Sequence, residues 1–445
     1  MLDGAATSVN EDGKSGRPEP VVTTISWIAI AILLLMTILS YIDRNIMSLM
    51  VDPIKADLGL DDIQMSLLLG FAFALFYAMF SVPMGWAADR FPRRWVIFLG
   101  VGGWSLATAA CGFAGSFGQL AVARFAVGIG EAALTPAAYA IVGELFPRRR
   151  LGLALGILAM GTAAGSAIAF LIGGPIIAWV DHVGGISGFA TWQVVFMLVG
   201  LPGLLIAPLI FIVPEKRRAH VTTHAQADQG FFPWIGQNWA FIVPFFTAIS
   251  FAGIISYALG AWLPAYLTRT MGVDVSKVGL TIGSIQLLGI IGFVAGGWFV
   301  DWMVSRGVRD AHLRYLIGAL ALAGISGLGA FLFADSLNAL LIWLALFYLT
   351  IPFTGPAIAL VQIVAPRRFH SRTIAIYTLA INMVGMMAGP TSVAWFTEEV
   401  FGGPQHVGSG ITAVFAISVP LALICFILSI PAARRMAERQ ALAGD

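Results

Sequence analysis

Twelve long apolar stretches follow one another along this chain of 445 residues, separated only by short polar joints. A helix that crosses a bilayer needs about 20 apolar residues, and each stretch approaches or exceeds that length. Continuous apolarity over such lengths excludes strands and indicates spanning helices. The apolar windows place these helices at 26–50, 64–88, 95–114, 119–145, 151–178, 191–213, 239–267, 276–303, 314–333, 337–364, 372–397 and 410–432. We therefore expect an all-α integral membrane protein.

The composition excludes several classes of function. Only 11% of the residues are charged and 59% are apolar, so no sizeable soluble domain, such as an ATP-hydrolysing motor, fits beside twelve helices. The 25 basic and 23 acidic residues are too evenly balanced for a protein that binds nucleic acid. The six histidines show no metal-ligand spacing. We expect no enzyme activity, no metal and no cofactor.

The basic residues predict which side of the membrane each joint occupies. Twenty of the 25 fall in both termini and in every second joint, whereas the other joints hold only Lys55, Arg269 and Lys277. Cytoplasmic joints carry the excess of lysine and arginine. The pattern predicts a multi-pass protein of the cell membrane with both termini in the cytoplasm.

A hydrophilic connection divides the twelve helices into six and six. We expect a cytoplasmic tail (1–24), a first six-helix bundle (25–213), a central cytoplasmic loop (214–238), a second bundle (239–432) and a cytoplasmic tail (433–445). Two motifs recur across this division in the same order. They are Gly85-x-x-x-Asp89 with Gly297-x-x-x-Asp301, and Pro147-Arg148 with Pro366-Arg367, at offsets of 212 and 219 residues. The repeat predicts two pseudo-symmetric halves with a central site between them.

Away from the ends of the predicted helices, only four charged side chains fall inside the membrane: Asp43, Arg44, Arg124 and Glu131. A charge within the membrane costs about 2.5 to 3.5 kcal/mol on insertion scales, which makes each one a candidate for function. At 1.5 Å per residue, Asp43 and Arg124 lie at similar depths, so a pair between them is geometrically reasonable. Glu131 lies two turns beyond Arg124, near the midplane.

The chemistry of these groups suggests their roles. Burial favours the neutral form of a carboxyl group and a nearby arginine favours the charged form, so Asp43 and Glu131 are candidates for proton coupling. Arginine does not deprotonate, and Arg124 is therefore a counter-charge or an anchor for an anionic substrate. Arg44 is either a second such residue or a side chain that extends to the interface. The alternative is an inert cluster that holds two helices together.

The predicted spans of the second half carry no charge away from their ends. Polar residues that could line a cavity there, or join helices by hydrogen bonds, are Ser256, Tyr257, Gln286, Thr354, Tyr377 and Asn382. A sugar acid would leave hydroxyl groups unpaired against such a wall, at about 1 to 3 kcal/mol each. The asymmetry favours an amphiphile whose charged head lies near Arg124 and Glu131.

Glycines within the spans predict close contacts between helices. The run Gly128-x-Gly130-x-x-Ala133 matches a relaxed dinucleotide fingerprint, but it lies inside a span with no strand before it, so we interpret it as helix packing. Gly161 and Gly165 in the fifth span, with Gly152 and Gly156 before them, predict a similar seam.

The string Gly85-x-x-x-Asp89-Arg90-x-x-x-Arg94 resembles the loop motif of the major facilitator superfamily, and twelve helices with a central loop match that family over the whole chain. Gly85 would let the second helix approach a neighbour closely. Asp89 would cap the helix or pair with arginines of the adjoining bundle. With Asp301 in the repeat, we interpret these residues as a conformational latch.

Within that superfamily, two strings resemble the spinster-like lipid transporters in a bacterial-type form. They are Tyr41-Ile42-Asp43-Arg44, and Gly128-Ile129-Gly130-Glu131-Ala132 followed by Leu145-Phe146-Pro147. The resemblance implies proton-linked movement of a lysophospholipid or a sphingosine-phosphate-like molecule, with Asp43, Arg124 and Glu131 central to it.

Three other interpretations compete with lipid transport. The first string is equally similar to organic-anion symporters, and a proton-coupled symporter of sugar acids is the main alternative. Gly174-Pro175 lacks the further glycines of the drug-antiporter branch, which disfavours a multidrug pump. A receptor or scaffold would need the buried charges to satisfy one another in a closed bundle. We expect a monomer whose partners are an amphiphilic or anionic small molecule, protons and membrane lipid.

Overall fold

The computed structural model describes residues 22–184, 188–215, 230–308, 310–366 and 369–444, and within these ranges every regular element is a helix. Twelve helical stretches there have the length and apolar character to cross a membrane. They confirm the predicted count and the all-α class. The predicted tail 1–24 and the central loop 214–238 lie mostly outside the described ranges.

We number the twelve membrane spans in chain order. The elements of spans 1 to 6 are α1 (Thr24–Ile46), η1 (Met47–Met50) and α2 (Val51–Leu58); α3 (Asp62–Ser66), η2 (Leu67–Phe71) and α4 (Ala72–Arg90); α5 (Arg93–Cys111); α6 (Phe117–Glu131) and α7 (Leu134–Leu145); α8 (Arg148–His182); and α9 (Thr191–Ile206) with η3 (Ala207–Ile212).

The short helix α10 (Phe231–Gln237) precedes the second half. The elements of spans 7 to 12 are α11 (Trp239–Arg269); α12 (Val275–Gln286) and α13 (Leu288–Ser305); α14 (Ala311–Leu332); α15 (Leu337–Thr350) and α16 (Thr354–Val364); α17 (His370–Leu379), η5 (Ala380–Val384), α18 (Gly385–Trp395) and η6 (Phe396–Val400); and η7 (Pro404–His406) with α19 (Val407–Gly444).

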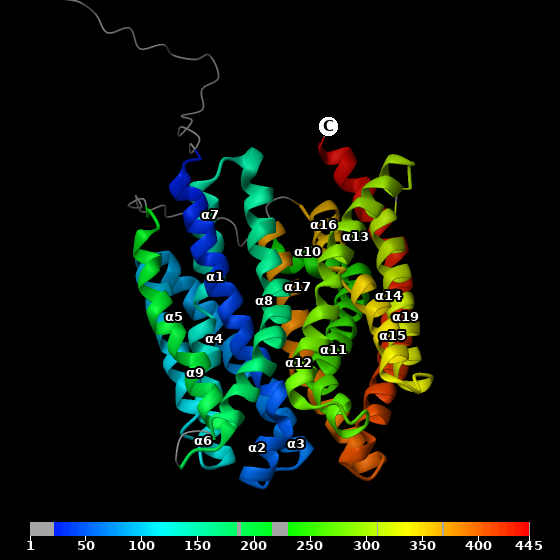
Figure 1. Cartoon of the computed structure of the whole chain (residues 1–445). Coiled ribbons are helices and arrows are strands. Elements are labelled where there is room, and N and C mark those ends of the chain that lie inside the picture. Colours follow the sequence, from blue (N-terminus) through cyan, green and yellow to red (C-terminus); the bar gives the residue numbers. More distant parts are fainter. Residues whose placement is uncertain (1–21, 185–187, 216–229, 309, 367–368, 445) are drawn as a thin grey trace, which may run out of the picture.

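The two sets of six spans lie side by side (Figure 1). Helix α1 begins and α19 ends at the same face of the molecule, which we call the terminal face; α2 and α3 lie at the other, the opposite face. Helix α8 packs on α12, and α18 packs on η2, so spans 5 and 8 and spans 2 and 11 meet between the halves. These contacts form the walls of the space between the halves.

Glycines allow the close approaches that the sequence predicts. A Cβ atom at Gly128 would lie 2.6 Å from the main-chain oxygen of Phe73, and one at Gly130 would lie 2.7 Å from the main-chain nitrogen of Trp104. A Cβ at Gly165 would lie 2.8 Å from the Cβ of Tyr41, which confirms this part of the seam between spans 1 and 5. Such distances are too short for any side chain, so these backbones pack directly.

Several spans are interrupted near their middle. Helix α6 ends at Glu131 and α7 begins at Leu134; the interruption of span 10 begins at Ile351, which is 219 residues beyond Ala132. The same offset separates the two Pro-Arg runs, so the repeat extends to the shape of the helices. Breaks in spanning helices are tolerated where they are buried in protein or line a cavity.

Candidate functional site

A cavity of about 360 Å³ lies between the two halves. This volume is typical of small-molecule sites, which measure roughly 300 to 1,000 Å³. Its wall combines residues of both bundles. Its wall includes Tyr41, Arg44, Ser48, Ser166, Tyr257, Gln286, Phe293, Val294, Tyr348 and Thr354.

Arg44 is the formally charged side chain in this cavity wall, and it is bound from behind by Glu131. Its Nε atom donates to Glu131 Oε2 at 2.6 Å, and the hydroxyl of Ser40 donates to the same oxygen at 2.6 Å. The Arg44 side chain is 11% exposed, whereas that of Glu131 is fully buried. The sequence left the role of Arg44 open, and the structure places it in the cavity wall beside the buried acid.

Aromatic rings hold the Arg44 guanidinium in place. Its central carbon lies 4.6 Å from the ring centre of Phe73 and 5.0 Å from those of Tyr41 and Tyr77. The guanidinium of Arg124 lies 5.5 Å from the same Phe73 ring. A cation within about 6 Å of a ring centre is attracted to the ring face. The rings therefore orient a cation that water would otherwise solvate.

Asp43 points away from the cavity, as expected for the neighbour of Arg44 on a helix. Its Oδ2 accepts a hydrogen bond from Thr108 at 3.2 Å, and the side chain is completely buried. The predicted pair between the side chains of Asp43 and Arg124 is not formed, and Arg124 instead contacts the main chain of Asp43. Arg124 Nη1 donates to the main-chain oxygen of Asp43 at 3.5 Å, and no ion pair within 4 Å joins the two side chains in the described structure. Arg124 is completely buried beside the Phe73 ring and does not line the cavity.

The cluster contains two acids and two bases, but its hydrogen bonds are incomplete. Among the described residues, Asp43 Oδ1 and Glu131 Oε1 have no hydrogen-bond partner, nor do Nε and Nη2 of Arg124. Buried polar groups are nearly always hydrogen-bonded, so unpaired carboxylate oxygens at this depth need an explanation. A carboxyl oxygen that no donor holds can accept a proton. Arginine cannot exchange one at any ordinary pH.

The polar candidates of the second half fall into two groups. Tyr257, Gln286 and Thr354 line the cavity; Asn382 does not, but accepts a hydrogen bond from the Tyr257 hydroxyl at 2.6 Å. Gln286 accepts from Ser166 at 2.9 Å and donates to Tyr348 at 3.4 Å. Neither Ser166 nor Tyr348 was among the residues predicted to line the cavity. Ser166 follows Gly165 of the helix seam, and that neighbouring glycine was the available signal.

The predicted latch residues lie near the terminal face. Arg94 donates to Glu215 Oε2 at 3.2 Å and thereby joins span 3 to the end of span 6 within the first half. Asp89 and Asp301 lie exposed on α4 and α13. The expectation for Gly85 was wrong, because a Cβ there would only reach 4.0 Å from the Cβ of Pro136, an ordinary contact.

Arg90 and Asp310 make further contacts near the terminal face. The Arg90 guanidinium lies 4.8 Å from the ring centre of Trp86, on its own helix. Asp310 accepts from Arg434 at 2.5 Å and from Arg314 at 2.8 Å, which ties the start of α14 to α19. Burial by itself would raise the pKa of the Asp310 carboxyl, but these hydrogen bonds outweigh it, so the pKa lies below its usual value.

The sequence model of the Major Facilitator Superfamily matches residues 33–390, which is most of the chain and includes spans of both halves. The chain belongs to the Major Facilitator Superfamily. It is accordingly a multi-pass membrane transporter of small molecules and not an enzyme.

Relatives and a solved structure place the chain within this superfamily. It is 29% identical over 420 residues to an MFS-type efflux pump of Mycolicibacterium smegmatis, covering 92% of this chain and 94% of that protein. It is 29% identical over 316 residues to the hexuronate transporter of Bacillus subtilis, covering 68% and 72%.

The fold is also that of a bacterial homologue of the human lysosomal transporter Spinster, solved in an inward-facing, unoccupied conformation. The TM-score is 0.74 at 24% identity, over 94% of this chain and 99% of that one. The resemblance read from the sequence therefore extends to the fold.

Proposed function

We propose that the chain is a proton-coupled secondary transporter that works by alternating access at the cavity between its halves. The observation that carries the proposal is the Arg44–Glu131 pair: the base lines the cavity, and the acid bound to it is buried. A transporter couples two ligands when both bias the same equilibrium. We place both termini in the cytoplasm, because the terminal face carries most of the basic residues.

The pair suggests how substrate and proton are coupled. An anionic group that enters the cavity meets Arg44 and competes with Glu131 for its N–H groups, since a guanidinium binds carboxylates and phosphates alike. Glu131 then keeps only the hydrogen bond from Ser40, and a proton bound to this acid would replace the contact with Arg44 that it has lost. Asp43 and Arg124, both completely buried, set the charge balance of the cluster, and Asp43 is the second proton-coupling candidate.

The cavity favours an amphiphilic anion such as a lysophospholipid or a sphingosine-phosphate-like molecule. Arg44 offers a cation for the head group. The wall contributed by α13 is apolar, and its Phe293 and Val294 are 37% and 66% exposed in the protein itself. Apolar side chains of this kind gain about 25 cal/mol for each square ångström that a substrate tail covers.

A second candidate is an organic anion of the sugar-acid type. The observation that favours it is the set of amide and hydroxyl groups in the wall, where Gln286 lies between Ser166 and Tyr348. These groups can pair with substrate hydroxyls. The relative named a hexuronate transporter adds support to this alternative.

Purified protein in liposomes with an imposed pH gradient tests the proposal. We expect gradient-dependent movement of a labelled lysophosphatidic acid that a protonophore abolishes. Movement of a labelled hexuronate alone would establish the second candidate. Movement of the lysolipid at a rate that does not depend on the pH gradient would contradict proton coupling.

Arg44→Gln should weaken substrate binding, because it removes the cation from the cavity wall and leaves Glu131 without it. We expect KM to rise about tenfold or more, in line with the loss of a charged hydrogen-bonded partner. Arg439→Gln is the matched control, since this exposed arginine lies on α19 near the chain end. Equal KM values for the two variants would exclude Arg44 as the substrate cation.

A further inference from the structure

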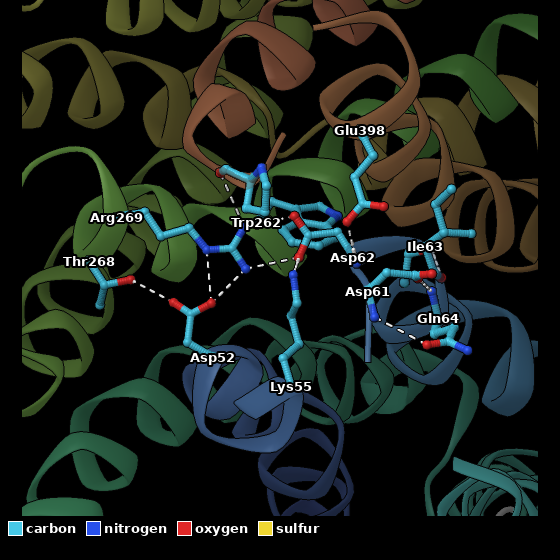
Figure 2. Close-up of polar contacts among 12 residues, drawn as sticks. Asp52, Lys55, Asp61, Asp62, Ile63, Gln64, Trp262, Thr268, Arg269 and Glu398 are labelled. Carbon is cyan, nitrogen blue, oxygen red and sulfur yellow. Dashed lines mark hydrogen bonds and ion pairs between the residues drawn. The ribbon is translucent and has the colours of Figure 1, made fainter. Parts of the chain in front are cut away.

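A network of charged side chains joins the two halves at the opposite face (Figure 2). Arg269, the last residue of α11, lies between Asp52 of α2 and Asp62 of α3. Its Nη2 and Nε atoms donate to Asp52 Oδ1 at 2.6 and 2.8 Å, and its Nη1 and Nη2 atoms donate to Asp62 at 2.8 and 3.0 Å. One guanidinium of the second half thus bridges two carboxylates of the first.

Asp62 is the centre of this network. Its side chain is completely buried, and its Oδ1 also pairs with Lys55. Its main-chain N–H donates to Glu398 Oε1 at 2.6 Å, so an acid of η6 in span 11 caps the start of α3. The second half therefore reaches Asp62 from two spans, 7 and 11. Both contacts would break together if the halves separated at this face.

The surroundings favour an arginine at position 269. The main-chain oxygen of Pro404 accepts from its Nη1 at 3.3 Å, and its guanidinium lies 5.6 Å from the ring centre of Trp262. The Arg269 side chain is only 11% exposed. A planar guanidinium can serve two carboxylates and a carbonyl at once, whereas a lysine ammonium cannot reproduce that fork.

The network lies between the cavity and the opposite face. Ser48 lines the central cavity and also a small pocket on the other side of it, whose wall includes Asp52 and Thr268. Thr268 in turn donates to Asp52 Oδ2 at 3.4 Å. Ser48 therefore lies between the central cavity and the Asp52–Thr268 contact, next to the residues that hold Arg269.

We propose that Arg269, Asp52, Asp62 and Glu398 form the gate that closes the cavity toward the opposite face, with Arg269 as the residue that ties the halves. The inference rests on the proposed alternating access. Access from this face requires spans 1 and 2 to separate from spans 7 and 11, which exposes buried charges to water. Removing one partner of a buried charge network favours the open state, because the remaining charges are then better solvated.

A thiol at position 48 tests the gate. Cys111 and Cys425 are first replaced by alanine, and Ser48→Cys is labelled in intact cells with a membrane-impermeant maleimide. Arg269→Ala should raise the labelling rate about tenfold or more, which corresponds to loss of a buried charged contact. Lys277→Ala is the matched control, because it removes an exposed cation of the same face and should leave the rate unchanged.

Two further variants separate gating from misfolding. Arg269→Lys keeps the positive charge but not the planar guanidinium group. This variant should be expressed at the level of the parent protein and should give an intermediate labelling rate. Arg269→Asp should label fast, and adding Asp52→Arg should slow labelling again; the Asp52 side chain is 43% exposed and has room for the change. Equal labelling rates for Arg269→Ala and Lys277→Ala, or no slower labelling in the double variant than in Arg269→Asp, would contradict the proposed gate.

The outcome is independent of the proposed substrate. Labelling needs no substrate, so an incorrect choice of lipid or sugar acid leaves it unchanged. The side of the reagent is checked with Lys277→Cys and Ser305→Cys, which are exposed on the opposite and terminal faces respectively. Labelling of position 305 and not of 277 would reverse the proposed orientation, and the reagent would then be applied from inside in inverted vesicles.

Discussion

Asp43 and Arg44 are neighbours on α1, but their side chains contact different parts of the protein. Arg44 faces the cavity and Glu131, whereas Asp43 faces Thr108 and Arg124 in the interior of the first bundle. Consecutive residues differ by about 100° around a helix, so they cannot share one groove. The charge presented to the cavity is therefore that of Arg44, and we propose that the two buried acids take up the coupling protons.

Glu131→Gln should abolish accumulation driven by a pH gradient. Glutamine keeps the size of the side chain and the contact with Ser40, but it takes up no proton in the transport cycle. Exchange of labelled for unlabelled substrate across the liposome membrane should persist, because it requires no net proton movement. The measurement compares both modes of transport with the parent protein, and undiminished gradient-driven uptake would refute the assignment.

Glycines and helix breaks decide how the elements pack. Close backbone contacts join spans 2 and 4 at Gly128 and spans 5 and 8 at Gly174, where a Cβ would lie 2.8 Å from the main-chain oxygen of Ser276. The break after Glu131 lies within span 4, and Pro136 follows in the first turn of α7. Proline is tolerated there, because a backbone N–H in the first turn has no partner within the helix. The sequence indicated the glycine contacts, but not the breaks.

Gly128→Ala should destabilise the protein by about 1 to 3 kcal/mol, because the added methyl group overlaps the main chain of α4. Gly102→Ala should have little effect, since no heavy atom within 4 Å would meet the new Cβ. Thermal unfolding of both variants in the same detergent checks the difference. Equal midpoints would show that spans 2 and 4 can move apart without cost.

The whole molecule is closed at one face and holds its cavity between two similar halves. Contacts between the halves at the opposite face include the Arg269 network and the packing of α8 on α12. The terminal face carries most of the basic residues of the joints, so under the orientation that we propose the closed face lies outside.

Fusions at the chain end test this orientation. A green fluorescent protein after residue 445 should fluoresce in bacterial cells, and alkaline phosphatase at the same point should be inactive, because the enzyme folds only outside the cytoplasm. Phosphatase inserted in the joint after Phe113 should be active, since that joint lies at the opposite face. The reverse pattern would place the termini outside.

Twelve spans, their helical nature, the repeat of six and the four charges inside the membrane follow from the sequence alone. Hydropathy is a sum over neighbouring residues, and the cost of a charge in lipid applies wherever it falls along a span. No tertiary contact is needed for either inference. The sequence also indicated the close packing at Gly128 and Gly165, but the same pattern includes Gly156, where an added Cβ would meet no atom within 4 Å.

Only the tertiary structure decided which charges meet. Glu131 binds Arg44 instead of Arg124, Gly85 has room for a side chain, and Arg269, assigned by sequence to an outer joint, bridges Asp52 and Asp62. Each outcome depends on how far a helix is rotated and where it breaks, and both are set by packing between spans distant in sequence. A shift of one residue turns a side chain by about 100°, so pairing cannot be read from order along the chain.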